Sequence, residues 1–398
     1  DHQGSGRVGG DGVMAKLGEV CIQITDGSHN PPSGVEQSEY LMLSSKNIDD
    51  DFITLDSPRF LSHSDYIAEN KRTTVSEGDL LMTIVGTIGR VAIVPAGLNG
   101  ICLQRSVAVI KPNKEIINNR YLMYQLQNMR SFLEKEARGV AQKGIYLKQV
   151  SQLDIKLPEL EQQKQIVKVL DKVTELISLR KQQLTKLDEL VKARFVEMFG
   201  TFPANPFRWS IGKIQDVVSD VRYGSSRPAV EGGKYPYLRM NNITYSGELD
   251  LRDTKRIDIP DSELDKCTVR RGDVLFNRTN SKELVGKTCV YNRDELMVLA
   301  GFVIRVRVNE RIRSEVLSAF LNMDFSKRML IGMCKTAIGQ ANINAKELQN
   351  IDLYIPPIEL QDQFVTLKNK IDQQKQTVQQ SLDKLELLKK ALMQEYFG

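Results

Sequence analysis

The side chains in this sequence that could do chemistry are mostly hydrogen-bonding residues in short loops between predicted strands. Arg and Lys suit guanine, Asn and Gln suit adenine, and Lys, Arg and Ser suit phosphate groups. For any one of these residues, ordinary solvation of a loop is an equally good explanation. As a set that recurs at matching places in both halves, they predict contact with DNA. The candidates are Ser28, His29, Lys46, Asn47, Gln104, Arg105, Gln142, Lys143 and Tyr146 in the first half, and Arg222, Tyr223, Ser225, Arg227, Arg239, Asn241, Arg278, Asn280, Lys282, Gln340 and Asn342 in the second.

Motifs for catalysis are incomplete. Residues 30–33 read Asn-Pro-Pro-Ser, which is similar to a motif of adenine methyltransferases, but that chemistry needs an aromatic residue where Ser33 stands. No Gly-rich loop for S-adenosylmethionine follows a predicted strand, and there is no phosphate-binding P-loop. Residues 144–146 match half of a nuclease motif whose second half is missing. We therefore expect no catalytic residue and no cofactor.

Histidines and cysteines are too few and too scattered to predict a metal site, and no CxxC pair is present. Scattered cysteines suit a reducing cytosol, so we expect a cytoplasmic protein. No stretch approaches the 18 apolar residues of a membrane span. The charge balance, 55 Lys and Arg against 50 Asp and Glu, is mildly basic and compatible with a nucleic-acid partner. The residues are His2, His29 and His63, and Cys21, Cys102, Cys267, Cys289 and Cys334.

Two long segments, 160–199 and 360–397, must position these loops. In each, apolar residues recur every seventh position with a second apolar row between them, and Gly and Pro are absent. This pattern predicts two helices, each with a narrow apolar seam that needs a partner helix. Connectivity makes the pair antiparallel if the helices pack along their length. The predicted seam comprises Leu170, Ile177, Leu184 and Val191 in the first helix, and Ile371, Val378, Leu385 and Leu392 in the second.

The chain repeats itself after about half its length. Phe199-Gly200 corresponds to Phe397-Gly398, and residues 78–81 (Gly-Asp-Leu-Leu) correspond to residues 272–275 (Gly-Asp-Val-Leu). Repeats on this scale indicate a duplicated domain. The fold class that follows is α+β, with two mixed, mostly β domains joined by a long antiparallel two-helix coiled coil and related by a pseudo-two-fold axis.

The expected boundaries follow from the repeat. Residues 1–13 look like an added leader. Domain one covers 14–157, the first long helix 158–200, domain two 201–355 and the second long helix 356–398. Within domain one, alternating and apolar runs predict strands at 40–44, 80–85, 91–94 and 106–110 and a helix over 118–137.

This layout resembles the specificity (S) subunit of type I restriction–modification systems. The resemblance rests on the half-length duplication, on Leu157–Val167 and Ile355–Val365 at the start of the two helices, and on Asp26–His29 near the start of the first half. It implies two target-recognition domains, each of which reads one half of a bipartite asymmetric site in double-stranded DNA. The helices would set the spacing and dock two methyltransferase (M) subunits, and restriction (R) subunits would join the full complex. An S subunit has no catalytic centre of its own.

Two other classes of protein remain open from the sequence. One is a fused DNA methyltransferase or nuclease, against which the missing cofactor loop counts. The other is a coiled-coil adaptor whose two domains bind proteins rather than nucleic acid. Binding of S-adenosylmethionine would favour the first, and failure to bind any duplex in the presence of M subunits would favour the second.

Overall fold

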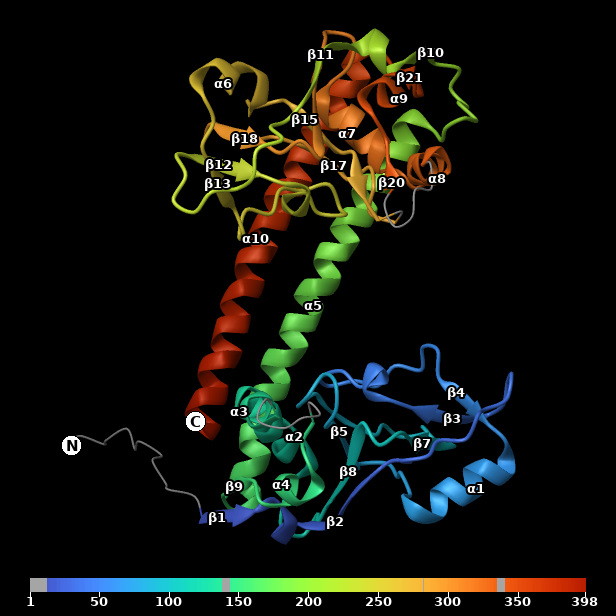
Figure 1. The fold of residues 1–398 in the computed structure, drawn as a ribbon, viewed down its shortest axis with the longest axis vertical. Coiled ribbons are helices and arrows are strands. Elements are labelled where there is room, and N and C mark those ends of the chain that lie inside the picture. The colour runs from blue at the N-terminus through green and yellow to red at the C-terminus, as the bar shows by residue number, and fades with distance from the viewer. Residues whose placement is uncertain (1–12, 138–143, 282, 335–340) are drawn as a thin grey trace, which may run out of the picture. The chain divides into compact units, whose positions relative to one another are not determined.

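The computed structural model describes residues 13–137, 144–281, 283–334 and 341–398, and Figure 1 labels its elements. The chain divides into two compact units. Unit 1 comprises the described residues up to Leu179 together with Leu382–Gly398, and unit 2 comprises Arg180–Ser381. The mixed α+β class that the sequence predicts is confirmed. Most of the expected leader lies outside the described residues, and the first strand begins at Val13.

Unit 1 contains a four-stranded antiparallel sheet in the order β2-β8-β5-β6 and a three-stranded sheet in the order β4-β3-β7, in which β3 and β7 are parallel. Strands β1 and β9 form a separate antiparallel pair. The elements are β1 (Val13–Lys16), β2 (Cys21–Asp26), β3 (Tyr40–Leu43), β4 (Arg59–Leu61), α1 (His63–Arg72), β5 (Leu80–Thr83), β6 (Val91–Ile93), β7 (Ile101–Leu103), β8 (Val107–Pro112), α2 (Asn119–Asn128), α3 (Arg130–Ala137), α4 (Leu147–Ser151), β9 (Asp154–Leu157) and the start of α5 (Leu160–Phe199).

Unit 2 repeats this arrangement. One four-stranded sheet has the order β11-β19-β15-β17, and another has the order β13-β12-β18-β14, in which β12 and β18 are parallel. The elements are β10 (Ser210–Lys213), β11 (Val218–Tyr223), β12 (Tyr235–Leu238), β13 (Lys255–Ile257), α6 (Asp261–Cys267), β14 (Thr268–Val269), β15 (Val274–Asn277), β16 (Thr279–Asn280), β17 (Thr288–Val290), β18 (Met297–Leu299), β19 (Val303–Val308), α7 (Ser314–Asn322), α8 (Asp324–Met333), β20 (Ala341–Asn342), α9 (Ala345–Gln349), β21 (Asp352–Ile355) and the part of α10 (Ile358–Phe397) that precedes Leu382.

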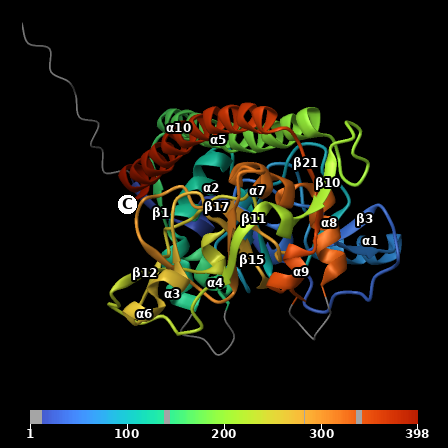
Figure 2. The same cartoon turned by 90° about the horizontal axis from the view of Figure 1, so that it is seen from above.

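The strand after each Gly-Asp pair is buried on both faces, which explains its continuous apolar run. In β5, Leu80 and Met82 join one core cluster, and Leu81 joins another. In β15, Val274 and Phe276 face one cluster and Leu275 the other. Helix α7 lies against β17 in both views of the fold (Figures 1 and 2).

The predicted single helix over 118–137 is two helices. Asn118 caps α2, since its side-chain oxygen accepts hydrogen bonds from the backbone N–H groups of Arg120 and Tyr121. The chain then breaks at Met129, and α3 begins at Arg130. Apolar spacing continues across this one-residue break, so periodicity alone could not detect it.

Helix α5 covers the predicted range 160–199, and α10 begins at Ile358, two residues before the predicted range 360–397. Gly200 ends α5 with a φ of +83°, a conformation that suits glycine. In unit 2, Phe195 and Phe199 on α5 pack edge-to-face on Phe364 of α10. In unit 1, Met393 and Phe397 near the end of α10 join the core that contains the start of α5.

Among the described residues, none of the helices combines the length and the apolar character that a membrane span needs.

A buried glutamine fixes the start of each long helix to its own domain. Gln163 is fully buried in the first turn of α5. Its Oε1 accepts a hydrogen bond from the backbone N–H of Asn118 at 2.8 Å. Its Nε2 donates to the carbonyl oxygens of Ile116 at 3.2 Å and Pro158 at 2.8 Å.

Gln361 makes the same three kinds of bond at the start of α10. Its Oε1 accepts from the backbone N–H of Arg313 at 2.8 Å. Its Nε2 donates to the carbonyl oxygens of Arg311 at 3.1 Å and Pro356 at 2.8 Å. Both glutamines therefore join the turn before a domain helix to the proline turn that begins the long helix.

Replacing Gln163 with Ala should destabilise unit 1 by about 2–4 kcal/mol, because buried backbone groups would lose their partners. Urea unfolding measures this change. Gln165→Ala, two residues further along at an exposed position, is the matched control and should change stability by no more than about 0.5 kcal/mol. Equal stability of the two variants would show that the buried amide does not fix the helix.

Candidate nucleic-acid interface

In unit 1, backbone hydrogen bonds bring several candidate loops together at one place. The N–H of Ser28 donates to the carbonyl of Leu103 at 2.7 Å, and the N–H of Arg105 donates back to the carbonyl of Ser28 at 2.9 Å. The N–H of Gln104 donates to Leu43, which precedes the Ser44–Asn47 loop. We call residues 27–29, 44–47, 84–87, 104–106 and 144–146 loop cluster 1.

The remaining loops of cluster 1 are joined in the same way. The N–H of Ser45 donates to the Ser106 hydroxyl at 3.1 Å. Val85 pairs with Gly144, and the N–H of Ile145 donates to the carbonyl of Ile84 at 2.9 Å. Residues from five separate segments thus form one surface.

Of the candidates in cluster 1, His29, Lys46, Arg105 and Tyr146 are exposed, and Gln104 is half-buried. Tyr146 has 63% of its surface exposed, which is high for an aromatic residue. The His29 imidazole lies 2.7 Å from an Asp26 carboxylate oxygen. These side chains supply hydrogen-bonding and stacking groups at the surface.

Ser28 and Asn47 lie inside cluster 1 rather than on its surface. The Ser28 hydroxyl donates to Glu69 at 3.0 Å. Asn47 is 3% exposed, its Oδ1 accepts from the backbone N–H of Ser44, and its Nδ2 donates to the carbonyl of Asp56. We assign both residues to holding the loops. Sequence alone did not distinguish such an Asn from one that reads a base.

Unit 2 builds the equivalent surface. The N–H of Ser225 donates to the carbonyl of Leu299 at 2.7 Å, and Gly301 donates back to Ser225 at 2.7 Å. The N–H of Arg278 donates to Phe302 at 3.0 Å, and strand β16 pairs with β20. We call residues 222–227, 239–242, 278–281, 300–302 and 341–343 loop cluster 2.

One glycine in each unit makes this convergence possible. An added Cβ on Gly27 would collide with the carbonyl oxygen of Leu103, and one on Gly224 would collide with that of Leu299. Only glycine permits so close an approach of two backbones. The loops are therefore held by backbone contacts that leave the neighbouring side chains free to differ.

Three candidate arginines in cluster 2 already pair with carboxylates. The distance from a guanidinium nitrogen to a carboxylate oxygen is 2.8 Å for Arg222 and Asp220, 2.7 Å for Arg227 and Glu263, and 3.0 Å for Arg239 and Asp253. The hydrogen bond between Arg227 and Glu263 raises the pKa of Arg227. Contact with DNA would require each of these arginines to exchange or share its carboxylate.

The other candidates of cluster 2 are less uniform. Arg278 stacks on Tyr223, with its guanidinium carbon 4.8 Å from the ring centroid. Asn241 and Asn342 are exposed, Asn280 is half-buried, and Ser225 is 4% exposed. The candidates Gln142, Lys143, Lys282 and Gln340 lie outside the described residues.

Sequence reasoning missed Phe302, which is 53% exposed within cluster 2. An aromatic residue directly after Ala300-Gly301 is the signal that could have identified it. Exposed aromatic side chains in a nucleic-acid interface can stack on bases. Among the described residues, no group of His, Cys, Asp and Glu could hold a metal ion.

The seam residues of the long helices vary in burial. Leu170, Ile177, Ile371 and Val378 are at most 9% exposed. The other four predicted positions are half-buried: Leu184, Val191, Leu385 and Leu392.

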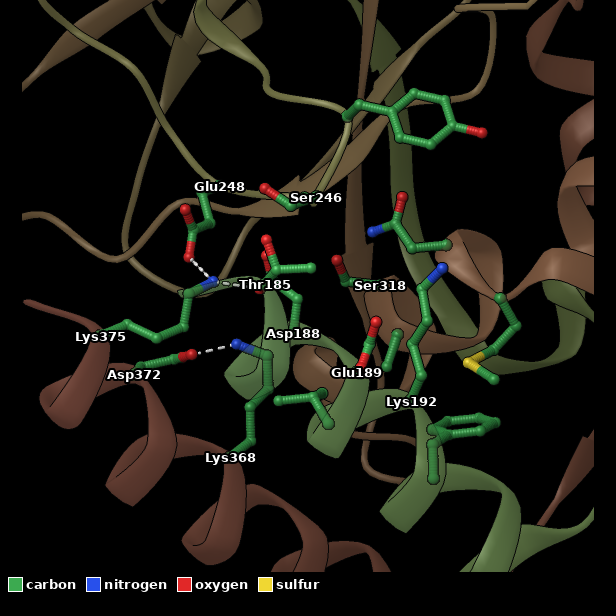
Figure 3. A pocket seen from close by; sticks show the side chains of 17 residues that line it. Thr185, Asp188, Glu189, Lys192, Ser246, Glu248, Ser318, Lys368, Asp372 and Lys375 are labelled. Atoms are coloured by element: carbon green, nitrogen blue, oxygen red, sulfur yellow. Dashed lines mark hydrogen bonds and ion pairs between the residues drawn. The ribbon is translucent and has the colours of Figure 1, made fainter. Parts of the chain in front are cut away.

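A cavity of about 280 Å³ lies within unit 2, between the two long helices, the turn Tyr245–Glu248 and α7 (Figure 3). Lys375 on α10 points into it and bonds to both Asp188 of α5 and Glu248 of the turn. Burial lowers the pKa of Lys375, but its two carboxylate partners raise it overall. We assign this cavity a structural role, since its central ion pairs tie both helices to the domain.

Comparisons with known proteins place the chain in a family. The family model described as the type I restriction modification DNA specificity domain matches residues 41–189 and again residues 208–387. Each match includes most or all of one loop cluster. The chain therefore belongs to this family.

Named relatives are specificity subunits. The type I restriction enzyme MjaVIII specificity subunit of Methanocaldococcus jannaschii is 26% identical over 350 residues, which cover 81% of this chain and 79% of the relative. The EcoKI specificity subunit of Escherichia coli K12 is 23% identical over 229 residues, covering 54% of this chain. For two of the relatives, the chain spans about half of their length, 46% and 49%.

A solved structure has the same fold. The crystal structure of a type I restriction-modification S subunit from M. genitalium aligns with a TM-score of 0.57 at 12% identity. The alignment covers 98% of this chain and 97% of that chain.

Two adjacent asparagines in cluster 2 test the division between structural and exposed residues. Asn242 is 1% exposed, its Oδ1 accepts from the N–H of Arg239 at 2.8 Å and its Nδ2 donates to the carbonyl of Asp250 at 2.8 Å. Asn242→Ala should lower the free energy of unfolding by about 1–3 kcal/mol. Asn241→Ala, at the exposed neighbouring position, should leave it within about 0.5 kcal/mol of wild type. Urea unfolding measures both changes. A larger loss of stability for Asn241→Ala than for Asn242→Ala would contradict the structural role of Asn242.

Proposed function

We propose that this protein is a DNA sequence-specificity subunit that has no catalysis of its own and acts with methyltransferase and restriction subunits. Domain one (14–157) and domain two (201–355) each read one half of a bipartite asymmetric site in double-stranded DNA. Two M subunits dock on the long helices, and R subunits join the full complex, in the cytoplasm. The observation that carries the proposal is the double family match, which includes most of loop cluster 1 and all of loop cluster 2.

The two domains are products of an internal duplication. Support comes from equivalent contacts at corresponding positions: the buried glutamines Gln163 and Gln361, and the close glycines Gly27 and Gly224. Duplicated domains joined by antiparallel helices would present their reading surfaces with pseudo-two-fold symmetry. Their half-sites would then lie in inverted orientation.

The helices at 158–200 and 356–398 form an antiparallel coiled coil that acts as a spacer. Support comes from the two units taken separately. In unit 2 the end of α5 packs on the start of α10. In unit 1 the end of α10 shares a core with the start of α5. Both contacts have the sense expected of antiparallel helices.

The half-sites differ because the side chains on equivalent loops differ. At equivalent positions, cluster 1 exposes Lys46 where cluster 2 exposes Asn241, and cluster 1 has Gly144 where cluster 2 exposes Asn342. Lysine and arginine suit guanine, and asparagine suits adenine. The complete site is therefore asymmetric although the scaffold is repeated.

Mapping of modified adenines in the source genome, with and without this gene, tests the proposal. Loss of the gene should remove modification from one bipartite motif and from no other. Restoring the gene should restore that motif. Unchanged modification after loss of the gene would contradict the proposed function.

Single substitutions in the two clusters should affect separate half-sites. Arg105→Ala should alter recognition only of the half read by domain one, and Asn342→Ala only that read by domain two. A base contact should relax one position by ~1–3 kcal/mol, whereas a phosphate contact should weaken all sequences alike. Methylation of a duplex library by the assembled complex measures both effects.

Lys114→Ala, at an exposed site outside cluster 1, is the control for Arg105→Ala and should leave both half-sites unchanged. A cluster variant that altered both half-sites equally would show that the domains do not read DNA independently.

Lengthening the helices should change the spacing and leave the half-sites intact. Inserting four residues after Lys181 and four after Gln379 should extend the helix pair by ~6 Å. Since one base pair is ~3.4 Å and roughly a tenth of a turn, the preferred gap should shift. Methylation of a library with random gap lengths is the measurement. A folded, active insertion variant that kept the original gap would show that another element sets the spacing.

A further inference from the structure

Arg278 occupies a scaffold position that domain one fills with a buried aliphatic residue. The N–H of Ile84 donates to Ser106, and its carbonyl accepts from Ile145. In domain two, the N–H of Arg278 donates to Phe302, and its carbonyl accepts from Ile343. Ile84 directly follows β5, and Arg278 directly follows β15, the buried central strand of each domain.

The two side chains at this position have opposite character. Ile84 is 3% exposed and belongs to the main core cluster of unit 1. Arg278 has the same backbone bonds, but its side chain is half-buried and lies over the ring of Tyr223, which is 37% exposed. Its Nε is buried without a hydrogen-bond partner among the described residues. Such an unpaired donor destabilises a fold by roughly 1–3 kcal/mol. The stability of the domain therefore does not explain the arginine.

Arg278 also differs from the other candidate arginines of cluster 2. Arg222, Arg227 and Arg239 each have a carboxylate partner. Within the described part of the chain, no ion pair involves Arg278, and its nearest polar contact is a long one, 3.5 Å from Nη1 to the carbonyl of Gly301. Its charge is therefore available to a ligand without the loss of an internal ion pair.

The guanidinium group of Arg278 lies over the ring of Tyr223. The guanidinium carbon lies 4.8 Å from the centroid of the ring. The Tyr223 hydroxyl is itself fixed, since it accepts a hydrogen bond from the backbone N–H of Ala345 at 2.8 Å. A stacked guanidinium keeps its outer N–H groups in a rigid fork, which suits bidentate recognition of a planar acceptor pair.

We propose that Arg278 reads a guanine in the half-site of domain two, by donating hydrogen bonds to O6 and N7 of the base. This inference rests on the proposed function, because it assumes that cluster 2 faces the DNA. Guanine presents two adjacent acceptors in the major groove and is the base that a planar arginine fork matches best. A phosphate could also accept two hydrogen bonds from the fork, but such a contact would weaken all sequences alike, whereas a guanine contact would affect one base pair.

The test uses the complete complex with its methyltransferase subunits and a duplex library that is randomised across both half-sites. Arg278→Ile installs the residue that domain one carries, and it should melt no lower than wild type. Arg278→Lys keeps the charge but removes the fork. Both variants should lose the preference for one G·C pair, in one half-site only, by roughly 5- to 150-fold.

Arg271→Ile and Arg271→Lys are the matched controls. Arg271 lies before the start of β15, whereas Arg278 lies after its end. Nε of Arg271 lies 2.7 Å from a carboxylate oxygen of Asp294. These variants should leave every base preference unchanged. Tyr223→Leu, which removes the stacking ring, should weaken the preference at the same G·C pair as the Arg278 variants.

The outcomes separate this inference from the proposed function. A wild-type complex that modified no bipartite site would overturn the proposed function. A bipartite wild-type site whose preferences survived both Arg278 substitutions would overturn the guanine assignment alone. So would equal weakening of all sequences, which marks a phosphate contact. If Arg278→Ile failed to fold, Arg278→Lys would decide between these results.

Discussion

The structure depends on burying the aromatic ends of its two long helices. Phe195 and Phe199 near the end of α5 are fully buried in the core of unit 2, and Phe397 near the end of α10 packs on Tyr121 in unit 1. Buried aromatic residues contribute much of the apolar area in a core. Each globular domain is thus completed by the last turns of a helix that begins elsewhere in the chain, and the glutamine at each helix start fixes its direction.

A fixed backbone combined with variable side chains explains how one scaffold can present two different surfaces. Glycine contacts and backbone hydrogen bonds join the loops in both units. Because these bonds do not involve side chains, Ile84 and Arg278 can occupy equivalent positions without moving the loops. The side chains of the loop clusters can therefore change while the core and the helices stay the same.

The sequence was sufficient to predict the elements that occur in both halves of the chain. Heptad spacing located both long helices, and the Gly-Asp pairs located the central strands. It did not predict which helix residues enter the domain cores: Met198 continues the apolar row, yet Phe195 and Phe199 are the fully buried residues. Tertiary contacts at the helix ends override the seven-residue period there. The sequence also could not predict the structural role of Asn47, because an Asn that caps a loop and an Asn that reads adenine have the same sequence signature.

The division of unit 1 between two distant segments has a consequence for biosynthesis. Leu382–Gly398 belongs to this unit, but roughly 200 residues separate it from the rest of the unit. At usual rates of translation, that interval takes roughly 10–40 s. During this time the apolar surface that Met393 and Phe397 later cover is exposed to water. The nascent first domain therefore exposes an apolar patch while the ribosome is still translating the chain. Chaperones can shield this patch during that interval.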